Sequence, residues 1–522
     1  MLCSVTDTPL SRKTVSMSLS CVRVPQGAIA QLSCFRADFY DSLTSRADAL
    51  FELTDALLCA DGPVKTLVGL ALEPEHRRGH GALYSGLNRG RIEVARLRRV
   101  LASMPLPRSA DGRLVLAVDV SPWLRPDAAT SDARSFCHTY GRGENKHLMI
   151  PGWPVSWIVA LETGRSSWTA PLDAVRLRPG DDLAAVTAAQ VRDLVRRLVE
   201  AGQWNVGDPL IWIVLDAGYD VMRLAWLLSD LPVELLGRLR SDRVMRRPAP
   251  SREEYYRAHP RGGHPPRHGG EFIFKDPRTW DTPDAETKTV TTRYGTAHAQ
   301  SWYRLHPELQ QRAAWRNHPG RLPVIEGTVI RLQVDHLPNG GDPKPLWLWW
   351  SQPTATPAET DQVWQAFLRR FDIEHFFRMI KQTLGWTAPK LRDPEAADNW
   401  TWLIIAAYTQ LRLARPLAID LRRPWERPVP SNRLTPHGSG AGSDTCVPRS
   451  RRRPQCRRHQ TTPHWINHKL RRRRPTSRPS PSRYPPKTDR GRPSQAGNVS
   501  RWPRHAAARR SPERGRPCAW RA

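Results

Sequence analysis

Apolar positions along the chain recur with two periods, one near 3.6 residues and one of two residues, and the changes between them divide the sequence. A helical pattern begins at Phe39, and a second one, rich in arginine, runs from about Gly81 to Ala102. We therefore expect a helical domain over residues 37–110, preceded by an irregular segment at residues 1–36. The arginines of this domain, such as Arg98, favour either DNA contact or a solvent-exposed helix face.

Strand and helix patterns alternate over residues 111–245. Their order is β-β-β-α-β-α-β, which is that of a ribonuclease H-like α/β core. We expect the first helix to begin with a capping box of Thr187 and Gln190 and to end before Gly202. The expected elements cover residues 113–120, 155–161, 166–172, 187–201, 209–215, 219–228 and 233–239.

Residues 246–355 interrupt this alternation. Proline, glycine and histidine are frequent near residues 248–270, and strand-like runs follow them. We expect a β-rich insertion here, after which core helices resume over residues 356–430. The strand-like runs are residues 289–293, 327–334 and 345–350, and the helical patterns cover about 359–384 and 393–414.

The composition is most unusual at the C-terminal end. The formal net charge of the chain is +30, and residues 437–522 contain 23 Lys and Arg but only 3 Asp and Glu. The same residues include only four Ile, Leu, Val or Phe, too few for a core. We therefore predict a disordered, Arg/Pro-rich tail over residues 431–522. A charge of this size predicts a polyanionic partner, usually nucleic acid.

Other features of the sequence argue against several classes of protein. The eight cysteines form no C-x-x-C pair, which argues against a zinc ribbon or a redox motif. The apolar runs are too short or too polar to span a membrane, so we expect a cytoplasmic protein without membrane association. A Walker A motif and a G-x-G-x-x-G loop are both lacking, so we expect no nucleotide cofactor.

Two aspartates stand at the ends of apolar, strand-like runs. They are Asp119 and Asp216. A carboxylate in such a place destabilises the fold unless it is paired or binds a cation, although either residue could instead form a turn or cap a helix. Asp127 and Asp220 are the local alternatives. Two such aspartates on neighbouring strands favour a divalent-metal site.

A third acid, Glu374, lies in a helical pattern with Arg370 four residues before it and Lys381 seven residues after it. This spacing places all three on one side of a helix. Lys381 could bind a phosphate, and Arg370 could do the same, orient Glu374, or form an ordinary surface ion pair with it. Asp372 is the alternative to Glu374. Two strand-end aspartates with a helix glutamate suit two-metal phosphoryl transfer.

The motif F-x2-R-x3-E-x6-K, which begins at Phe367, resembles the Y-x2-R-x3-E-x6-K signature of bacterial insertion-sequence DDE transposases. The resemblance implies cleavage at transposon ends with Mg²⁺, for which Mn²⁺ substitutes, and then strand transfer into target DNA. It also implies double-stranded DNA as substrate, a homodimer in the DNA complex and a bacterial, nucleoid-associated location. The two aspartates and the glutamate would bind the metal, and Arg370 and Lys381 would contact DNA.

Further candidates come from the tryptophans and the arginines. In related transposases an insertion-domain tryptophan stacks on a flipped base, and Trp280, Trp302 and Trp315 are candidates here, with core packing as the alternative. Arg238 and Arg240 could line a DNA groove or be surface residues. Two other functions stay open: a nuclease of the same fold without strand transfer, and a decayed transposase that only binds DNA.

Overall fold

The computed structural model describes residues 26–417, apart from residues 61, 80, 132, 141–146, 163–165 and 339. All of these belong to the first of two units into which the chain divides, Met1–Arg474. The predicted tail over residues 431–522 and most of the predicted irregular segment 1–36 lie outside the described residues. In the part that is described, no helix has the length and apolar character needed to cross a membrane.

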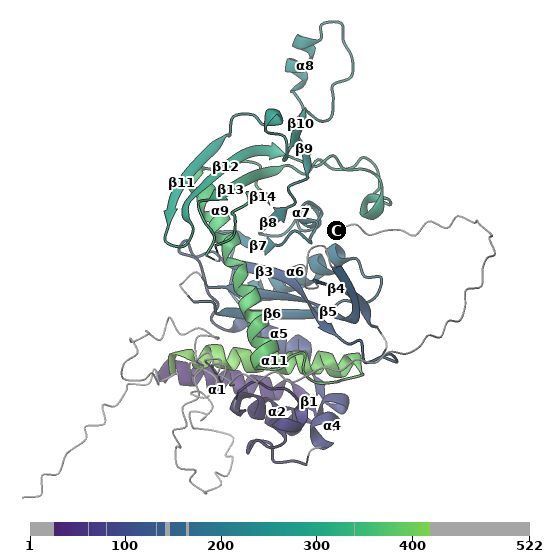
Figure 1. Cartoon of the computed structure of the whole chain (residues 1–522), viewed down its shortest axis with the longest axis vertical. Coiled ribbons are helices and arrows are strands. Elements are labelled where there is room, and N and C mark those ends of the chain that lie inside the picture. Colours follow the sequence, from purple (N-terminus) through teal and green to yellow (C-terminus); the bar gives the residue numbers. More distant parts are fainter. Residues whose placement is uncertain are drawn as a thin grey trace, which may run out of the picture. The chain divides into compact units, whose positions relative to one another are not determined.

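A mixed sheet of ten strands organises the described part of the chain (Figure 1). β7 and β8 run parallel to β3, whereas β5 is antiparallel to β3, and both β4 and β6 pair with β5. The five strands predicted between residues 111 and 245 are confirmed. The strands of this part are β3 (Val115–Leu124), β4 (Ser135–Tyr140), β5 (His147–Leu161), β6 (Thr169–Arg176), β7 (Ile211–Leu215) and β8 (Val233–Leu239).

Two details of these strands differ from the prediction. β3 does not end near Asp119 but continues to Leu124, because β5 pairs with it along its whole length. Pro122 is tolerated there because β7, the neighbour on the other side, pairs with β3 only as far as Val118. β4 was not predicted, since its sequence shows neither a clear alternation nor an apolar run.

The residues predicted to form a β-rich insertion extend the same sheet. β14 pairs with β8, and β13, β12 and β11 follow in order, all antiparallel, while β9 and β10 form a separate two-stranded ribbon. The elements are β9 (Val244–Arg246), α8 (Arg252–Ala258), β10 (Glu271–Ile273), β11 (Ala285–Thr291), β12 (Gly295–Leu305), β13 (Gly327–Val334) and β14 (Leu346–Trp350), with 3-10 turns at Pro277–Thr279 and Ala313–Trp315.

Side chains of the central strands alternate between two hydrophobic clusters, one on each face of the sheet. Leu116 and Val118 belong to the cluster that contains α6 and α7, whereas Val115 and Ala117 belong to the cluster that contains α9, α10 and α11. This is the period of two expected of a strand that is buried on both faces. The helices are α6 (Leu183–Glu200), α7 (Val221–Leu227), α9 (Pro357–Arg369), α10 (Phe371–Arg378) and α11 (Pro394–Ala414).

The N-terminal helices share their hydrophobic core with α11, which comes from the far end of the described chain (Figure 1). Leu32, Leu50, Ile404 and Leu411 are fully or almost fully buried in this one cluster. α1 begins at Gln26, ahead of the predicted start of the helical segment. The N-terminal elements are α1 (Gln26–Asp41), β1 (Leu43–Ser45), α2 (Ala47–Cys59), α3 (Leu67–Leu70), α4 (Gly81–Arg89), β2 (Arg91–Ile92) and α5 (Val94–Ser103).

The predicted capping box of α6 is wrong. The helix begins four residues earlier, at Leu183, because the side chain of Asp182 accepts hydrogen bonds from the amides of Ala184 and Ala185. Thr187 is instead a buried residue inside the helix. The C-terminal prediction is confirmed, since Gly202 adopts φ +66°, the left-handed conformation that favours glycine.

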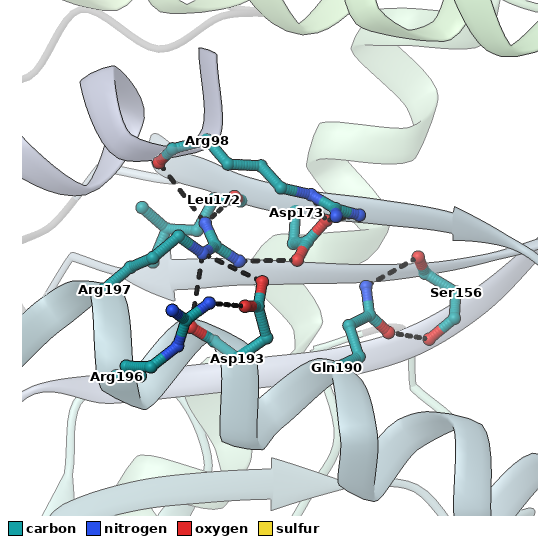
Figure 2. A network of polar contacts seen from close by, with 8 residues as sticks. All are labelled: Arg98, Ser156, Leu172, Asp173, Gln190, Asp193, Arg196 and Arg197. Carbon is teal, nitrogen blue, oxygen red and sulfur yellow. Dashed lines mark hydrogen bonds and ion pairs between the residues drawn. The ribbon is translucent and has the colours of Figure 1, made fainter. Parts of the chain in front are cut away.

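A buried ion-pair network joins α5, β6 and α6 (Figure 2). The carboxylate of Asp173 accepts hydrogen bonds from Arg98 at 2.9 Å and from Arg197 at 2.7 Å. The side chain of Asp173 is only 1% exposed, and Arg197 also donates to the carbonyl of Arg98. Arg98, whose side chain is 23% exposed, therefore takes part in an ion pair that joins the N-terminal helices to the sheet.

Candidate active site

The strand register brings the two predicted aspartates side by side. Asp216 directly follows β7, and its neighbour Leu215 is paired with Val118, the residue before Asp119. Because parallel strands end at the same edge of a sheet, both carboxylates lie where β7 stops. Both have the same parity as Ala117 and Val214, so they face the side of the sheet that α10 covers.

Arg370 holds these aspartates and Glu374 together. Its guanidinium nitrogens lie 3.5 Å from Oδ2 of Asp119, 3.3 Å from Oδ2 of Asp216 and 3.4 Å from Oε1 of Glu374. The side chain of Arg370 is only 5% exposed, whereas that of Glu374 is 47% exposed. The sequence predicted a pair between Arg370 and Glu374. The structure places that pair inside a cluster of three carboxylates rather than on an open surface.

The helix that carries these residues is not continuous. α9 ends at Arg369 and α10 begins at Phe371, so Arg370 occupies the junction, and a π-helical turn follows at Met379–Thr383. The single helix predicted over about residues 359–384 is therefore wrong in this detail. The breaks change the direction of the side chains, since a π-helical turn shifts the register that a regular helix would keep.

Lys381 lies in this π-helical turn and is half-buried between aromatic rings. Its Nζ is 5.9 Å from the ring centre of Phe377 and 5.7 Å from that of Trp386. Burial lowers the pKa of the Lys381 ammonium, and the negative charge of Asp119 acts in the opposite direction. The electrostatic influence of Asp119 shows that the fold brings Lys381 close to the carboxylate cluster.

The three alternative acids lie elsewhere. Asp127 is 44% exposed and pairs with Arg125 at 3.1 Å. Asp220 caps α7 by accepting a hydrogen bond from the amide of Arg223. Asp372 faces Arg369, whose Nη2 is 2.6 Å away. Within the described residues, none of these three acids forms an ion pair with Arg370. This favours Asp119, Asp216 and Glu374 as the acids of the site.

The buried environment of Asp119 disfavours the ionised form of its carboxyl group. Burial raises its pKa to about 6, while Arg370 and the amide of Val120 lower it and the charges of Asp216 and Glu374 raise it. Tyr219, which sequence analysis did not select, lies beside the same group. Burial, followed by the charge of Asp119, raises the pKa of the Tyr219 phenol well above its usual value. The feature of the sequence that could have identified Tyr219 is its position three residues after Asp216.

The donor set fits a divalent cation, although the geometry is not that of a closed metal site. Carboxylate oxygens are the ligands that Mg²⁺ prefers, and the buried Oδ1 of Asp216 accepts no hydrogen bond. Within the described residues, however, no three Asp, Glu, His or Cys side chains are grouped closely enough to hold one ion. Arg370 lies among the three acids, and its positive charge takes the place of a cation in balancing them.

Of the two arginines proposed for a DNA groove, one lies at the cluster. Arg238 has the parity of Leu236 on β8 and is 51% exposed, and its Nη1 is 3.9 Å from Oδ1 of Asp216. Arg240 instead pairs with Asp242 at 3.2 Å. The exposed guanidinium of Arg238 thus borders the carboxylates.

The candidate tryptophans are packed in the interior. Trp302 is 4% exposed, Trp315 is 9% exposed, and the half-buried Trp280 lies 5.3 Å from Trp347, measured between ring centres. Trp280 and Trp302 also donate their indole N–H groups to backbone carbonyls. These contacts favour the structural role over stacking on a base.

Comparison with known protein families finds one match, which covers about half of the chain. The model of the family described as DDE superfamily endonuclease matches residues 38–308, which include Asp119 and Asp216 but end before Glu374. A comparison of the chain with curated proteins found no match. Members of this superfamily generally use divalent metals, and their substrate is DNA. The chain belongs to the DDE superfamily of endonucleases.

Proposed function

We propose that the protein is a DDE transposase, which cleaves DNA at the ends of an insertion sequence and joins the freed ends to target DNA. One observation carries this proposal: Asp119, Asp216 and Glu374 converge on a single buried guanidinium although they come from three distant parts of the chain. Glu374 lies beyond the family match, so its assignment rests on this geometry.

The proposed catalytic domain is a ribonuclease H-like core. The order β6-β5-β3-β7-β8, with the last two strands parallel to β3, supports it. The proposed divisions are a helical domain over residues 37–110, core segments over 111–245 and 356–430, and an insertion over 246–355. Because β14 pairs with β8, the insertion and the core share one sheet.

In this proposal Asp119, Asp216 and Glu374 hold divalent ions, Mg²⁺ or Mn²⁺. When bound, such ions activate the attacking oxygen and stabilise the leaving oxygen. The carboxylates must be ionised to bind them, and Arg370 favours that state by lowering the pKa of Asp119. We assign Arg370 the role of a positioning residue, because its 5% exposure leaves little surface for DNA.

The proposed phosphate contacts are Lys381 and Arg238. Lys381 is near Asp119 and forms no ion pair within the described residues, so its ammonium is available to a phosphate of the substrate. Arg238 borders Asp216 at 3.9 Å and is half exposed. Two cations beside three acids give a site that binds both a metal and a DNA backbone.

A plasmid that carries the DNA flanking the gene tests the proposal. Wild-type protein should cut at the flanking ends with Mg²⁺ and not with EDTA, and Glu374→Gln should bind the same DNA without cutting it. Asp372→Asn is the matched control, because Asp372 lies on the same helix but pairs with Arg369 and not with Arg370, so that loss of its charge leaves the carboxylate cluster in place. Cleavage by Glu374→Gln at the wild-type rate would remove Glu374 from the site.

The same experiment separates the transposase from its alternatives. Joined products with a second plasmid indicate strand transfer, whereas cuts without joining indicate a nuclease of the same fold. Binding without cutting by the wild-type protein indicates a decayed copy that only binds DNA. A homodimer in the DNA complex, a bacterial origin and a cytoplasmic, nucleoid-associated location belong to the proposal and follow from the resemblance to insertion-sequence transposases.

A further inference from the structure

Tyr219 is a buried residue to which the proposed function assigns no role. It lies in the turn between β7 and α7, where its amide donates to the carbonyl of Asp216 at 3.2 Å. Its side chain is only 8% exposed and packs in the hydrophobic cluster that contains α6 and α7. Its hydroxyl is buried and forms no hydrogen bond of regular geometry with any residue that the structure describes. Burying a hydroxyl without a partner destabilises a fold, so a function is the natural reason for keeping this one.

The turn that carries Tyr219 follows the point at which β7 stops pairing with β3. β7 pairs with β3 only as far as Val118, whereas β5 pairs with β3 up to Leu124. From Asp119 onwards, β7 therefore no longer covers its side of β3. The amide of Val120 shows the consequence, because it donates to Oδ1 of Asp119 at 2.8 Å instead of to β7.

Asp119 is the charged group that acts most strongly on Tyr219. After burial, its charge is the largest cause of the raised pKa of the Tyr219 phenol, ahead of the effects of Arg370 and Asp216. The ring of Tyr219 packs on the face of the sheet that α6 and α7 cover, whereas Asp119 faces α10. The hydroxyl therefore approaches the carboxylate along the side of β3 that β7 leaves uncovered.

The carboxylate of Asp119 has capacity for a further donor. Its Oδ1 accepts from the amide of Val120, and its Oδ2 lies 3.5 Å from the guanidinium of Arg370. Each oxygen of an ionised carboxylate accepts about two hydrogen bonds. One more donor would thus restrain the carboxylate without displacing the two that it already has.

Ser156 is the other acceptor beside the Tyr219 hydroxyl. Its own hydroxyl donates to Oε1 of Gln190 at 2.8 Å, and Nε2 of Gln190 donates to the carbonyl of Ser156 at 3.3 Å (Figure 2). This pair is satisfied without Tyr219. A hydrogen bond to an ionised acceptor is about twice as strong as one between neutral groups, which favours Asp119 as the acceptor.

We propose that Tyr219 is a positioning residue, whose hydroxyl donates a hydrogen bond to the carboxylate of Asp119 and holds it in the orientation that binds a divalent cation. This inference rests on the proposed function, since it assumes that Asp119 is a metal ligand. Metal-binding carboxylates are commonly held by such outer hydrogen bonds, which fix their orientation before the ion arrives. The role explains why the chain buries a phenol at this position, where phenylalanine would fill the same space.

The test measures Mn²⁺ binding to the full chain by titration calorimetry in the absence of DNA. Tyr219→Phe should weaken the affinity by about 10- to 100-fold, which is the usual effect of losing an outer hydrogen bond to a metal ligand. Tyr408→Phe is the matched control, because Tyr408 is also buried and its hydroxyl accepts from the amide of Thr169 at 3.4 Å, away from the acids. This control should bind Mn²⁺ as the wild type does. Urea denaturation of both variants shows whether they are folded.

A third variant, Ser156→Ala, separates the two acceptors. It removes the hydroxyl of Ser156 but leaves Asp119 and Tyr219 unchanged, so its affinity for Mn²⁺ should stay close to that of the wild type. A loss as large as that of Tyr219→Phe would overturn the inference, because the phenol would then act through Ser156.

The remaining outcomes separate this inference from the proposed function. Unchanged affinity in Tyr219→Phe would overturn the inference even if the wild type binds Mn²⁺ and cuts DNA. An equal loss in Tyr408→Phe, or a urea midpoint of Tyr219→Phe well below that of Tyr408→Phe, would also overturn it, because general loosening of the fold would be the cause. A selective loss in Tyr219→Phe together with a wild type that never cuts DNA would support the inference and refute the transposase. A wild type that binds no Mn²⁺ would overturn both.

Discussion

Replacing Arg370 by glutamine tests whether this guanidinium keeps the acids of the site ionised. Arg370 lies 3.3 to 3.5 Å from three carboxylates, and it is the main influence that lowers the pKa of Asp119 against burial. In the wild type this pKa is about 6. Without Arg370, burial and the charges of Asp216 and Glu374 would be opposed mainly by the hydrogen bond from the amide of Val120.

The size of the effect follows from the contacts. An opposite charge at this range shifts a pKa by about 1 to 3 units, and we take the lower half because Asp119 is 24% exposed. A rise of 1 to 2 units, to about 7 to 8, corresponds to about 1.4 to 2.7 kcal/mol. The folded variant would therefore bind this proton more tightly than the folded wild type does.

The direction of the pKa shift of Asp119 determines the pH range in which the stabilities of wild type and Arg370→Gln differ. A carboxyl whose pKa is raised on folding gives stability that is complete below the unfolded value of about 4 and is lost as the pH rises through the folded value. In the wild type Asp119 completes this loss near pH 6. In Arg370→Gln the loss continues to about pH 7 to 8, so the two proteins diverge further between pH 6 and 8.

Urea denaturation at pH 5.5 and pH 8 measures this divergence. The stability gap between wild type and Arg370→Gln should widen by about 1.2 to 2.2 kcal/mol at the higher pH, slightly less than the full shift because Asp119 of the variant is not completely ionised at pH 8, with similar m values. Arg378→Gln is the control, because Arg378 is exposed on α10 and forms no ion pair within the described residues. A gap of the same size at both pH values would refute the reasoning.

Three further predictions follow from the same contacts. Arg197→Met leaves Asp173 with Arg98 alone and should lower the free energy of unfolding by about 3 to 5 kcal/mol, whereas Arg96→Met, at a surface pair, should change it by less than about 1. Asp216→Asn should weaken Mn²⁺ binding by at least about tenfold in titration calorimetry, and unchanged affinity would exclude Asp216 as a ligand. Lys381→Gln should raise KM for DNA more than it lowers kcat if Lys381 binds a phosphate away from the reacting bond.

Local pattern was sufficient for the two strands that carry the aspartates of the site. The apolar runs before Asp119 and Asp216 identified β3 and β7, because strands buried on both faces have few polar residues. Their period of two also determined which face each aspartate occupies once one face was known. The spacing of Arg370 and Glu374 placed them on one side of a helix, and the structure pairs them at 3.4 Å.

Other features depended on contacts between residues far apart in sequence. β3 extends to Leu124 only because β5 pairs with it, and the partners of Arg98 and Arg370 lie 75 and 251 residues away. Such contacts leave no local signal, since an arginine on a helix has the same pattern whether it faces solvent or a buried carboxylate.

The sequence by itself determined the types of element, the two acids that follow apolar runs and the basic character of the chain, because these depend on local periodicity and composition. Only the tertiary structure decided that Glu374 rather than Asp372 faces the aspartates. Both acids lie on α10, and the choice depends on which side of that helix packs against β3 and β7. Helix rotation is set by the burial of residues such as Ile373 and Phe376 against the whole core.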